Sequence, residues 1–255
     1  MKVQILGCSG GISEGLKTTS LLVDDSVLID AGTGIGDLSL ETLRNIRTVF
    51  LTHSHLDHVC GLPLLIDTIF DQLIDNPLTV YARPETVDAL QKHIFNNVIW
   101  PDFTLIPGIG KSVLNFKAVE LNTQVEINGV TFELLPVNHV IPACGYRVTN
   151  GSGSFAFSGD TTSNDTFWEA LNEGPAPGML IVEAAFPNSD IEICKLAYHY
   201  CPSLLAKDIL KLKHKTDIYL THLKPGSEQE IIDECKKAIK DRAFRQLAGG
   251  EIFTL

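Results

Sequence analysis

Short apolar runs dominate the first third of the chain. Four of them, separated by Gly, Ser and Asp, read KVQIL, SLLVDD, SVLIDAG and RTVFLTH. Runs of this length bounded by turn residues predict β-strands. From His55 onward the pattern changes to that of an apolar helix, LDHVCGLPLLIDTIFDQLI, followed by the strand-like LTVYA and a helix that begins at Pro84.

The second half of the chain repeats this order. The segments SVLNFKAVEL, GVTFELLPV, ACGYRVT and SGSFAFSGD are spaced as hairpins and predict a second half-sheet. The strands MLIVEAAF and DIYLTHL then alternate with the helices TFWEALN, PSLLAKDILKLK and SEQEIIDECKKAI. Two such halves would pack their sheets face to face with helices outside, which predicts an α/β fold, a four-layer αββα sandwich. Because no linker or short repeat divides the 255 residues, we expect one domain over 1–255.

Composition narrows the range of partners. A hydrophobic share of 44% with 20% charged residues is that of an ordinary globular protein. No apolar run has the length of a signal-peptide core or a membrane span, so we expect a cytoplasmic protein without a membrane partner. The six cysteines lack CxxC spacing and are interpreted as free, mostly buried thiols. The formal net charge of −11 disfavours nucleic acid as a partner, because that binding depends on Lys and Arg, but it leaves room for a small phosphate ester.

The strongest local signal lies where a predicted strand meets a predicted helix. His53, His55, Asp57 and His58 fall within six positions. His and carboxylate are the ligands that zinc and similar metals accept, and a turn at this point can direct the first pair one way and the second pair another. An isolated histidine is usually structural, but packing these four together without a cation would cost desolvation and repulsion. The spacing therefore predicts a site for two adjacent metals.

Further candidates stand at the ends of predicted strands downstream. His139 follows LLPVN, Asp160 follows FAFSG, and His222 follows DIYLT. Each ends an apolar strand, where loops from both sheets can converge on one edge. Asp30 in SVLIDAG has the same setting, and we interpret it as an acceptor that orients a ligating histidine.

The HSHLDH segment, with the later His, SGD and THL segments, resembles the ligand series of the metallo-β-lactamase superfamily along essentially the whole chain. The resemblance implies the metallo-β-lactamase fold and two divalent metal ions, with zinc the first choice and manganese or iron as alternatives. It also implies how seven ligands are shared: His53, His55 and His139 on one metal, Asp57, His58 and His222 on the other, and Asp160 bridging both.

A proton donor is also expected. His199 lies just before a predicted helix start at Pro202, and Glu183 ends the strand MLIVE. A carboxylate beside an imidazole raises its pKa, which suits a general acid at neutral pH. The alternative is that His199 only caps the helix and Glu183 is a surface carboxylate. Our hypothesis is that a metal-bridging hydroxide attacks phosphorus and His199 protonates the leaving oxygen, with Asp57 counted among the catalytic residues.

Three segments resemble the class II 3′,5′-cyclic nucleotide phosphodiesterases of this superfamily. They are HSHLDHVCGLPLL, LQKHIFNNVIWPDF, which is similar to the family's HIFNxxIWPDF, and VEAAFPN followed by HYCP. Departures are Ala185, where the family usually has Ser, and Tyr200 and Cys201, where Leu and Ser are commoner. The resemblance implies hydrolysis of cAMP, and of cGMP as a second candidate, and a homodimer. Trp100 and Phe103 are candidates to lie near the purine ring.

Other functions remain open. A tRNA 3′-end processing endonuclease would use the same metals with His199 and Glu183, but no basic arm or basic block is visible. A thioester, lactone or β-lactam hydrolase would usually lack that pair. The alternative that is not an enzyme is a non-catalytic metal-binding protein with the same fold.

Overall fold

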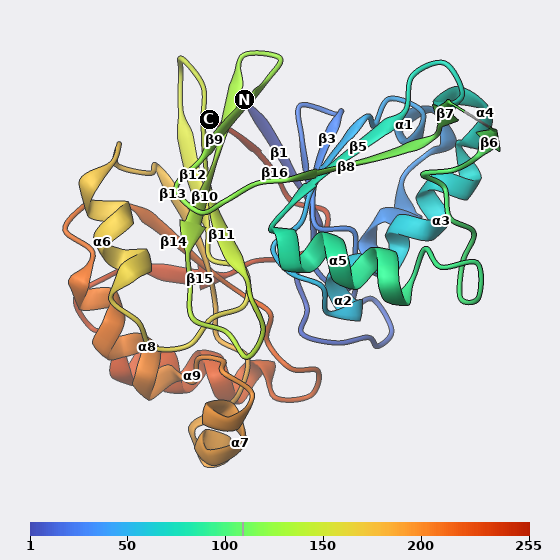
Figure 1. Ribbon diagram of the computed structural model, residues 1–255. Helices are drawn as coiled ribbons and strands as arrows, with labels where there is room; N and C mark the ends of the chain where they lie inside the picture. Colours follow the sequence, from blue (N-terminus) through green and yellow to red (C-terminus); the bar gives the residue numbers. More distant parts are fainter. Residues whose placement is uncertain (109) are drawn as a thin grey trace.

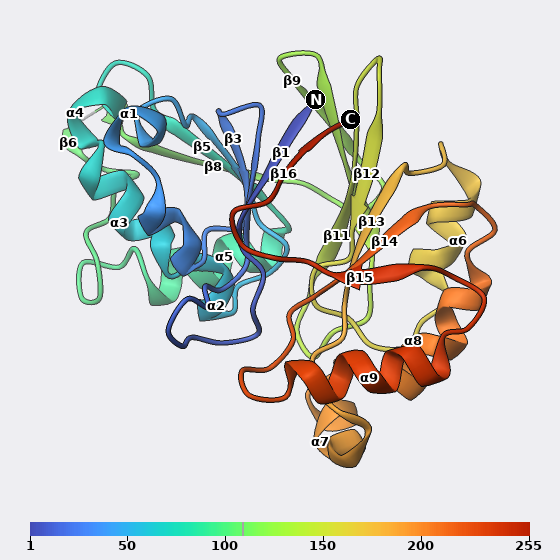
Figure 2. The same ribbon diagram turned by 180° about the vertical axis from the view of Figure 1, so that it is seen from behind.

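Two seven-stranded sheets face each other in the computed structural model, which describes residues 1–108 and 110–255. Helices cover the outer face of each sheet, so the layers run helix, sheet, sheet, helix (Figures 1 and 2). The predicted αββα sandwich is therefore confirmed. The two ends of the chain lie side by side, because the backbone N–H of Leu255 donates to the carbonyl of Met1 at 2.8 Å.

Each sheet has one antiparallel part and one parallel part, and the antiparallel strands come first along the chain, except for the last strand, β16. In spatial order the first sheet contains β16 (Ile252–Thr254), β1 (Lys2–Gly7), β2 (Ser20–Val23), β3 (Val27–Ile29), β4 (Thr48–Phe50), β5 (Leu78–Ala82) and β8 (Leu114–Ala118). The second contains β15 (Phe244–Gln246), β14 (Asp217–Thr221), β13 (Met179–Glu183), β12 (Ser154–Phe157), β11 (Cys144–Thr149), β10 (Val130–Pro136) and β9 (Gln124–Ile127). A small separate hairpin joins β6 (Pro107–Gly108) and β7 (Lys111–Ser112).

The helices divide between the two halves in the same way. The first half contains α1 (Leu40–Leu43), α2 (Leu56–Val59), α3 (Gly61–Thr68), α4 (Phe70–Leu73), α5 (Pro84–His93) and the 3₁₀ turn η1 (Thr33–Asp37). The second contains α6 (Thr166–Glu173), α7 (Ile191–Leu196), α8 (Pro202–Asp208), α9 (Glu228–Ala238), and the 3₁₀ turns η2 (Asn188–Asp190) and η3 (Ile209–Lys211).

Burial explains the sequence patterns. All five residues of β13 are buried, because helices cover one face of the strand and the other sheet covers the opposite face, so the strand is continuously apolar. In α6, by contrast, Phe167, Trp168 and Leu171 form one buried stripe that packs on the second sheet. Three apolar clusters result, one between the sheets and one beneath each helical layer.

Two details of the predicted elements are wrong. The apolar stretch 56–74 forms three short helices instead of one, and Ile69, with φ −110° and ψ 20°, interrupts the helical backbone between α3 and α4. The strand expected in SVLNFKAVEL, β8, does not belong to the second sheet but pairs in parallel with β5 in the first. A strand pattern identifies a strand but not its partner, which here is chosen after a long crossover through α5.

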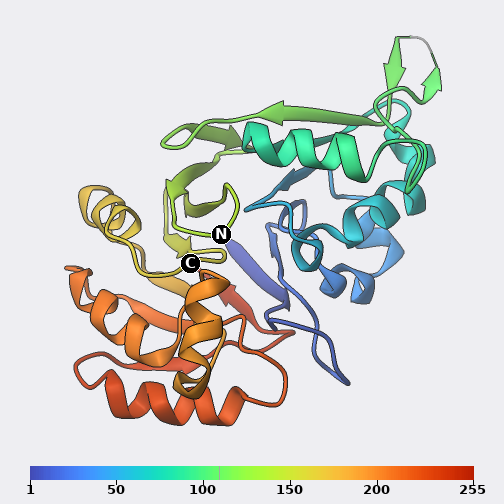
Figure 3. The same cartoon turned by 60° about the horizontal axis from the view of Figure 1, so that its bottom comes forward.

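Within the described residues, no helix combines the length and the apolar character needed to cross a bilayer. All six cysteines are free, four of them buried. The assignment of one domain to residues 1–255 stays a prediction. The site lies at the shared edge where the loops after β4, β10, β12, β13 and β14 meet. This edge comes forward in Figure 3.

Candidate metal centre

The turn from β4 into α2 carries four of the candidate ligands. His53 follows the buried strand, His55 is the N-cap residue of α2, and Asp57 and His58 lie in its single turn. The ring centroid of His53 lies 4.6 Å from that of His55 and 4.3 Å from that of His58. His53 and His58 are fully buried, whereas His55 and Asp57 are partly exposed.

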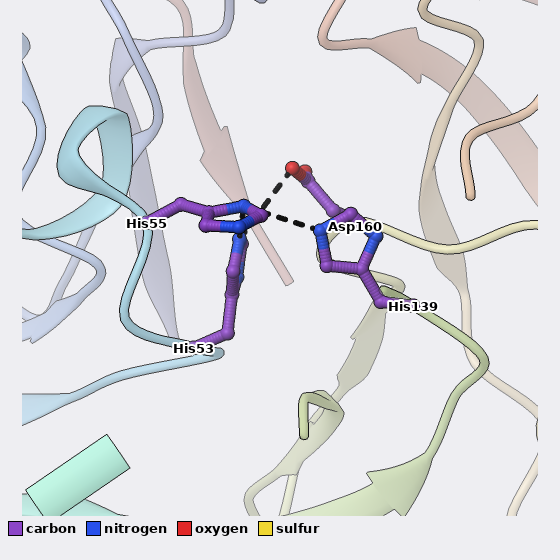
Figure 4. A group of neighbouring side chains, drawn as sticks. All are labelled: His53, His55, His139 and Asp160. Carbon is purple, nitrogen blue, oxygen red and sulfur yellow. Dashed lines mark hydrogen bonds and ion pairs between the residues drawn. The ribbon is translucent and has the colours of Figure 1, made fainter. Parts of the chain in front are cut away.

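The second half contributes one side chain per strand end. His139 follows β10, and its Nε2 lies 3.2 Å from Nδ1 of His55. Asp160 follows β12, and its carboxylate lies 3.3 Å from His58 Nε2 and 3.3 Å from Nδ1 of His222, which follows β14. His53, His55, His139 and Asp160 point toward one another across the gap between the two halves (Figure 4).

The seven side chains form two groups that share one carboxylate. Within each group, one ligand atom per residue lies within 4.8 Å of the others. The first group contains His53, His55, His139 and Asp160, and the second contains Asp57, His58, Asp160 and His222. The assignment of these seven residues to two metals stays a prediction.

The protonation of three of the histidines suits a cation. Burial lowers the pKa of His53 well below its usual value, that of His139 to about 4, and that of His222 to about 3, so these imidazoles are neutral at pH 7 and keep a free lone pair. Burial acts to raise the pKa of the Asp160 carboxyl, but the surrounding histidines outweigh it and hold the pKa well below its usual range, so it is ionised.

His58 lies between two carboxylates. Its Nε2 is fully buried and makes no hydrogen bond, but it lies 3.3 Å from the carboxylate of Asp160. Burial acts to lower the pKa of His58, but Asp160 and Asp30 outweigh it and hold the pKa well above its usual value. A cation beside Asp160 would replace the proton that these carboxylates favour. The residues present therefore fit a divalent metal site.

The ring nitrogens that face away from the centre are held by acceptors. His58 Nδ1 donates to Asp30 at 2.7 Å, and Thr52 donates to the same carboxylate through its backbone N–H at 2.8 Å. The Thr52 hydroxyl also lies 2.9 Å from Nδ1 of His53, and the carbonyl of Tyr198 accepts from Nδ1 of His139 at 3.0 Å. Such contacts fix the directions of the imidazole rings of these candidate ligands.

Two of these supporting groups were missed by the sequence analysis. Thr52 reads as an ordinary strand residue, and only its position beside His53 could have marked it. The carbonyl of Tyr198 carries no side-chain signal, although this residue and His222 adopt left-handed backbone angles, with φ of 56° and 61°. Strained backbone of this kind is typical of functional sites.

Glu183 and His199 form a buried pair beside the candidate metal ligands. His199 Nδ1 donates to Glu183 Oε1 at 2.7 Å, and the His199 ring lies 5.1 Å from that of His139 and 5.3 Å from that of His222. The backbone N–H groups of Thr161 and Tyr200 also donate to this carboxylate, at 2.8 and 3.1 Å.

The pair has the character of a proton donor. Burial acts to lower the pKa of His199, but the Glu183 carboxylate outweighs it and the net shift is upward. The alternative of a helix cap and a surface carboxylate is wrong, because Cys201 is the N-cap residue of α8 and Glu183 is fully buried.

The two aromatic residues predicted to lie near the purine ring, Phe103 and Trp100, have different surroundings. Phe103 is 2% exposed and packs against Phe70 and Phe95, so it belongs to the core and cannot contact a purine. Trp100 instead lines a pocket of about 230 Å³ together with Leu56, the residue between His55 and Asp57.

Comparisons with known proteins identify a similar family and similar relatives. The family described as cAMP phosphodiesterases class-II matches residues 38–153. A probable 3′,5′-cyclic-nucleotide phosphodiesterase of Yersinia pestis is 27% identical over 89% of this chain and 79% of its own length. A ribonuclease Z of Clostridium acetobutylicum is also 27% identical, over 98% of this chain and 83% of its own length.

Solved structures show the fold. Unliganded yeast PDE1 superposes with a TM-score of 0.81 at 20% identity, over 100% of this chain and 99% of that one. The metallo-β-lactamase fold protein YhfI of Bacillus subtilis superposes with a TM-score of 0.77, also at 20% identity, over 99% and 98% of the two chains.

Proposed function

We propose that this chain, a relative of the class II cyclic-nucleotide phosphodiesterases with the metallo-β-lactamase fold, hydrolyses 3′,5′-cyclic nucleotides to 5′-nucleotides with two bound divalent cations. The observation that carries the proposal is the position of Asp160, whose one carboxylate faces both groups of candidate ligands. Cyclic AMP is the first substrate and cyclic GMP the second.

In this proposal seven residues hold the cations, and zinc is the first choice because the donors are imidazole nitrogens and carboxylate oxygens. His53, His55 and His139 would hold one, Asp57, His58 and His222 the other, and Asp160 both. When bound, such a pair activates water and stabilises charge on the phosphate oxygens.

The chain's own residues supply the proton. Glu183 holds the Nδ1 proton of His199, so the other ring nitrogen, Nε2, presents its proton to the site. Because the pKa of His199 is raised, the ring stays protonated to a higher pH than an ordinary histidine and can donate to the 3′ oxygen as it leaves phosphorus. The pocket beside Trp100 would take the base.

A tRNA 3′-end endonuclease is the second candidate. The ribonuclease Z relative favours it, since that protein aligns with nearly the whole chain. The net charge of −11 argues against it, because a polyanion as large as tRNA requires a positive surface.

One parallel assay separates the candidates. Zinc- or manganese-loaded protein is incubated with cyclic AMP, with cyclic GMP and with a 3′-extended tRNA precursor, and products are measured with and without a chelator. We expect 5′-AMP that disappears on chelation and no cleaved tRNA. Cleavage of the tRNA alone would move the protein to the endonuclease branch, and no hydrolysis of any substrate would favour a non-catalytic metal-binding protein.

A His199→Ala variant tests the proton donor in the same assay. We expect kcat to fall by about 100- to 10,000-fold with the metal content unchanged, because removing a general acid leaves the ligands in place. Equal loss of turnover and metal would contradict the role given to His199.

A further inference from the structure

Lys224 stands two residues after His222 and is half-buried without a counter-ion. Its ammonium donates to the carbonyl of Gly10 at 2.8 Å and lies 5.4 Å from the centre of the Phe186 ring. None of the ion pairs formed by residues 1–108 and 110–255 includes Lys224. Its positive charge is therefore available to a bound anion.

Two separate contacts place this ammonium beside the candidate site. A Cβ atom added to Gly10 would lie 2.4 Å from the His222 carbonyl oxygen and 3.1 Å from its ring, so the Gly10 backbone rests directly on His222. On the other side, the Phe186 ring lies 5.7 Å from the ring of His199. Because the two imidazole rings are themselves 5.3 Å apart, Lys224 is held at the edge of the His199 and His222 stack.

The geometry points to Lys224 as an anion-binding residue, whose ammonium contacts a non-bridging phosphate oxygen of the substrate and of the product. The identity of that substrate rests on the proposed function. A lysine suits this task because it carries three N–H donors on a mobile stem, of which Gly10 uses one.

Charge predicts which species Lys224 binds more tightly. A cyclic diester carries one negative charge, whereas a 5′-monophosphate, with a second pKa of about 6, carries close to two at pH 7. A fixed cation therefore stabilises the product more than the substrate. Loss of the ammonium should weaken binding of 5′-AMP more than it raises KM for cyclic AMP.

The competing explanation is purely structural, with Lys224 only fastening the Gly10 loop to the strand end. Three variants separate the two. Lys224→Gln removes the charge but keeps a donor for Gly10, and Lys224→Arg keeps both. Lys117→Gln is the matched control, because Lys117 also lies over an aromatic ring, at 5.9 Å from the centre of Tyr81, but on the first sheet in β8.

Metal-loaded proteins are titrated calorimetrically with inorganic phosphate and with 5′-AMP, and their metal content and Tm are recorded. We expect Lys224→Gln to bind both ligands about 10- to 100-fold more weakly at unchanged metal content, because it loses a hydrogen bond to a charged group. Lys224→Arg and Lys117→Gln should stay close to the unchanged protein.

Phosphate affinity equal to that of the unchanged protein in Lys224→Gln would overturn the inference, as would an equal loss in Lys117→Gln. If Lys224→Gln fails to fold, lysine acetylation of the unchanged protein, read by mass spectrometry, replaces it. Phosphate should slow acetylation of Lys224 and not of Lys117, and equal rates would overturn the inference. Because phosphate binding does not require hydrolysis of cyclic AMP, failure of this inference and failure of the proposed function are separate results.

Discussion

The two halves of the molecule build their shares of the site in different ways. The first half concentrates four candidate ligands in the segment from His53 to His58, which runs from the end of β4 into α2. The second half distributes His139, Asp160 and His222 over three strand ends that lie far apart in the sequence. Local chain geometry therefore brings together the candidate ligands of the first half. Those of the second half come together only when the sheet has formed.

The largest expected effect comes from the residue at which the halves meet. Asp160→Ala should remove both cations and lower kcat/KM by about 1000-fold or more, because this carboxylate faces both ligand groups. Metal analysis and cyclic AMP hydrolysis measure the result, and Asp88→Ala on the exposed face of α5 is the control. Unchanged hydrolysis in Asp160→Ala would count against every enzymatic function.

A smaller effect is expected from a change to Asp30, which supports candidate ligands of the first half only. Asp30→Asn keeps the shape of the side chain but removes the charge that accepts from His58 and Thr52. We expect metal affinity to fall by about 10- to 100-fold, as is usual for partners of metal ligands. A competition titration with a chromophoric chelator measures it. Affinity equal to that of the unchanged protein would show that the His58 ring needs no such support.

The smallest expected effect is a shift in the pH dependence of kcat, caused by a change to Glu183 in the second half. Burial acts to lower the pKa of His199, and Glu183 raises it on balance, so the ring stays protonated to a higher pH than an ordinary histidine. In Glu183→Gln the charge is lost and the pKa of His199 falls. The alkaline limb of the kcat profile should then move to lower pH, so activity is lost more at pH 8 than at pH 6.

The control for this shift is Glu192→Gln, whose side chain is 80% exposed on α7. Profiles of kcat against pH for both variants and the unchanged protein are compared. A profile of Glu183→Gln that overlays that of the unchanged protein would remove Glu183 from the account of the proton donor.

The same contrast explains what the sequence could predict. The turn from His53 to His58 is recognisable from its spacing, and the structure places its four side chains in two groups. Their role as metal ligands stays a prediction. The pairing of β8 with β5 depends on a long crossover, and nothing in SVLNFKAVEL marks its partner. The support given to His139 comes from the carbonyl of Tyr198, a group that every residue possesses.

Contacts between sequentially distant residues account for the rest. Glu183 and His199 could be proposed as a pair from the sequence, but only the fold shows that they touch. Lys224 reads as an ordinary surface lysine after a strand. Its position over Phe186 and against Gly10 arises from the meeting of three separate loops.

The central claim is that the two halves meet at Asp160 to hold two cations, and metal counting tests it most directly. Metal-free protein is titrated with zinc, and bound metal per chain is measured by mass spectrometry beside cyclic AMP hydrolysis at each step. The account predicts two bound cations per chain and full activity only when both are present. Full activity with one cation per chain, or with none, would contradict it.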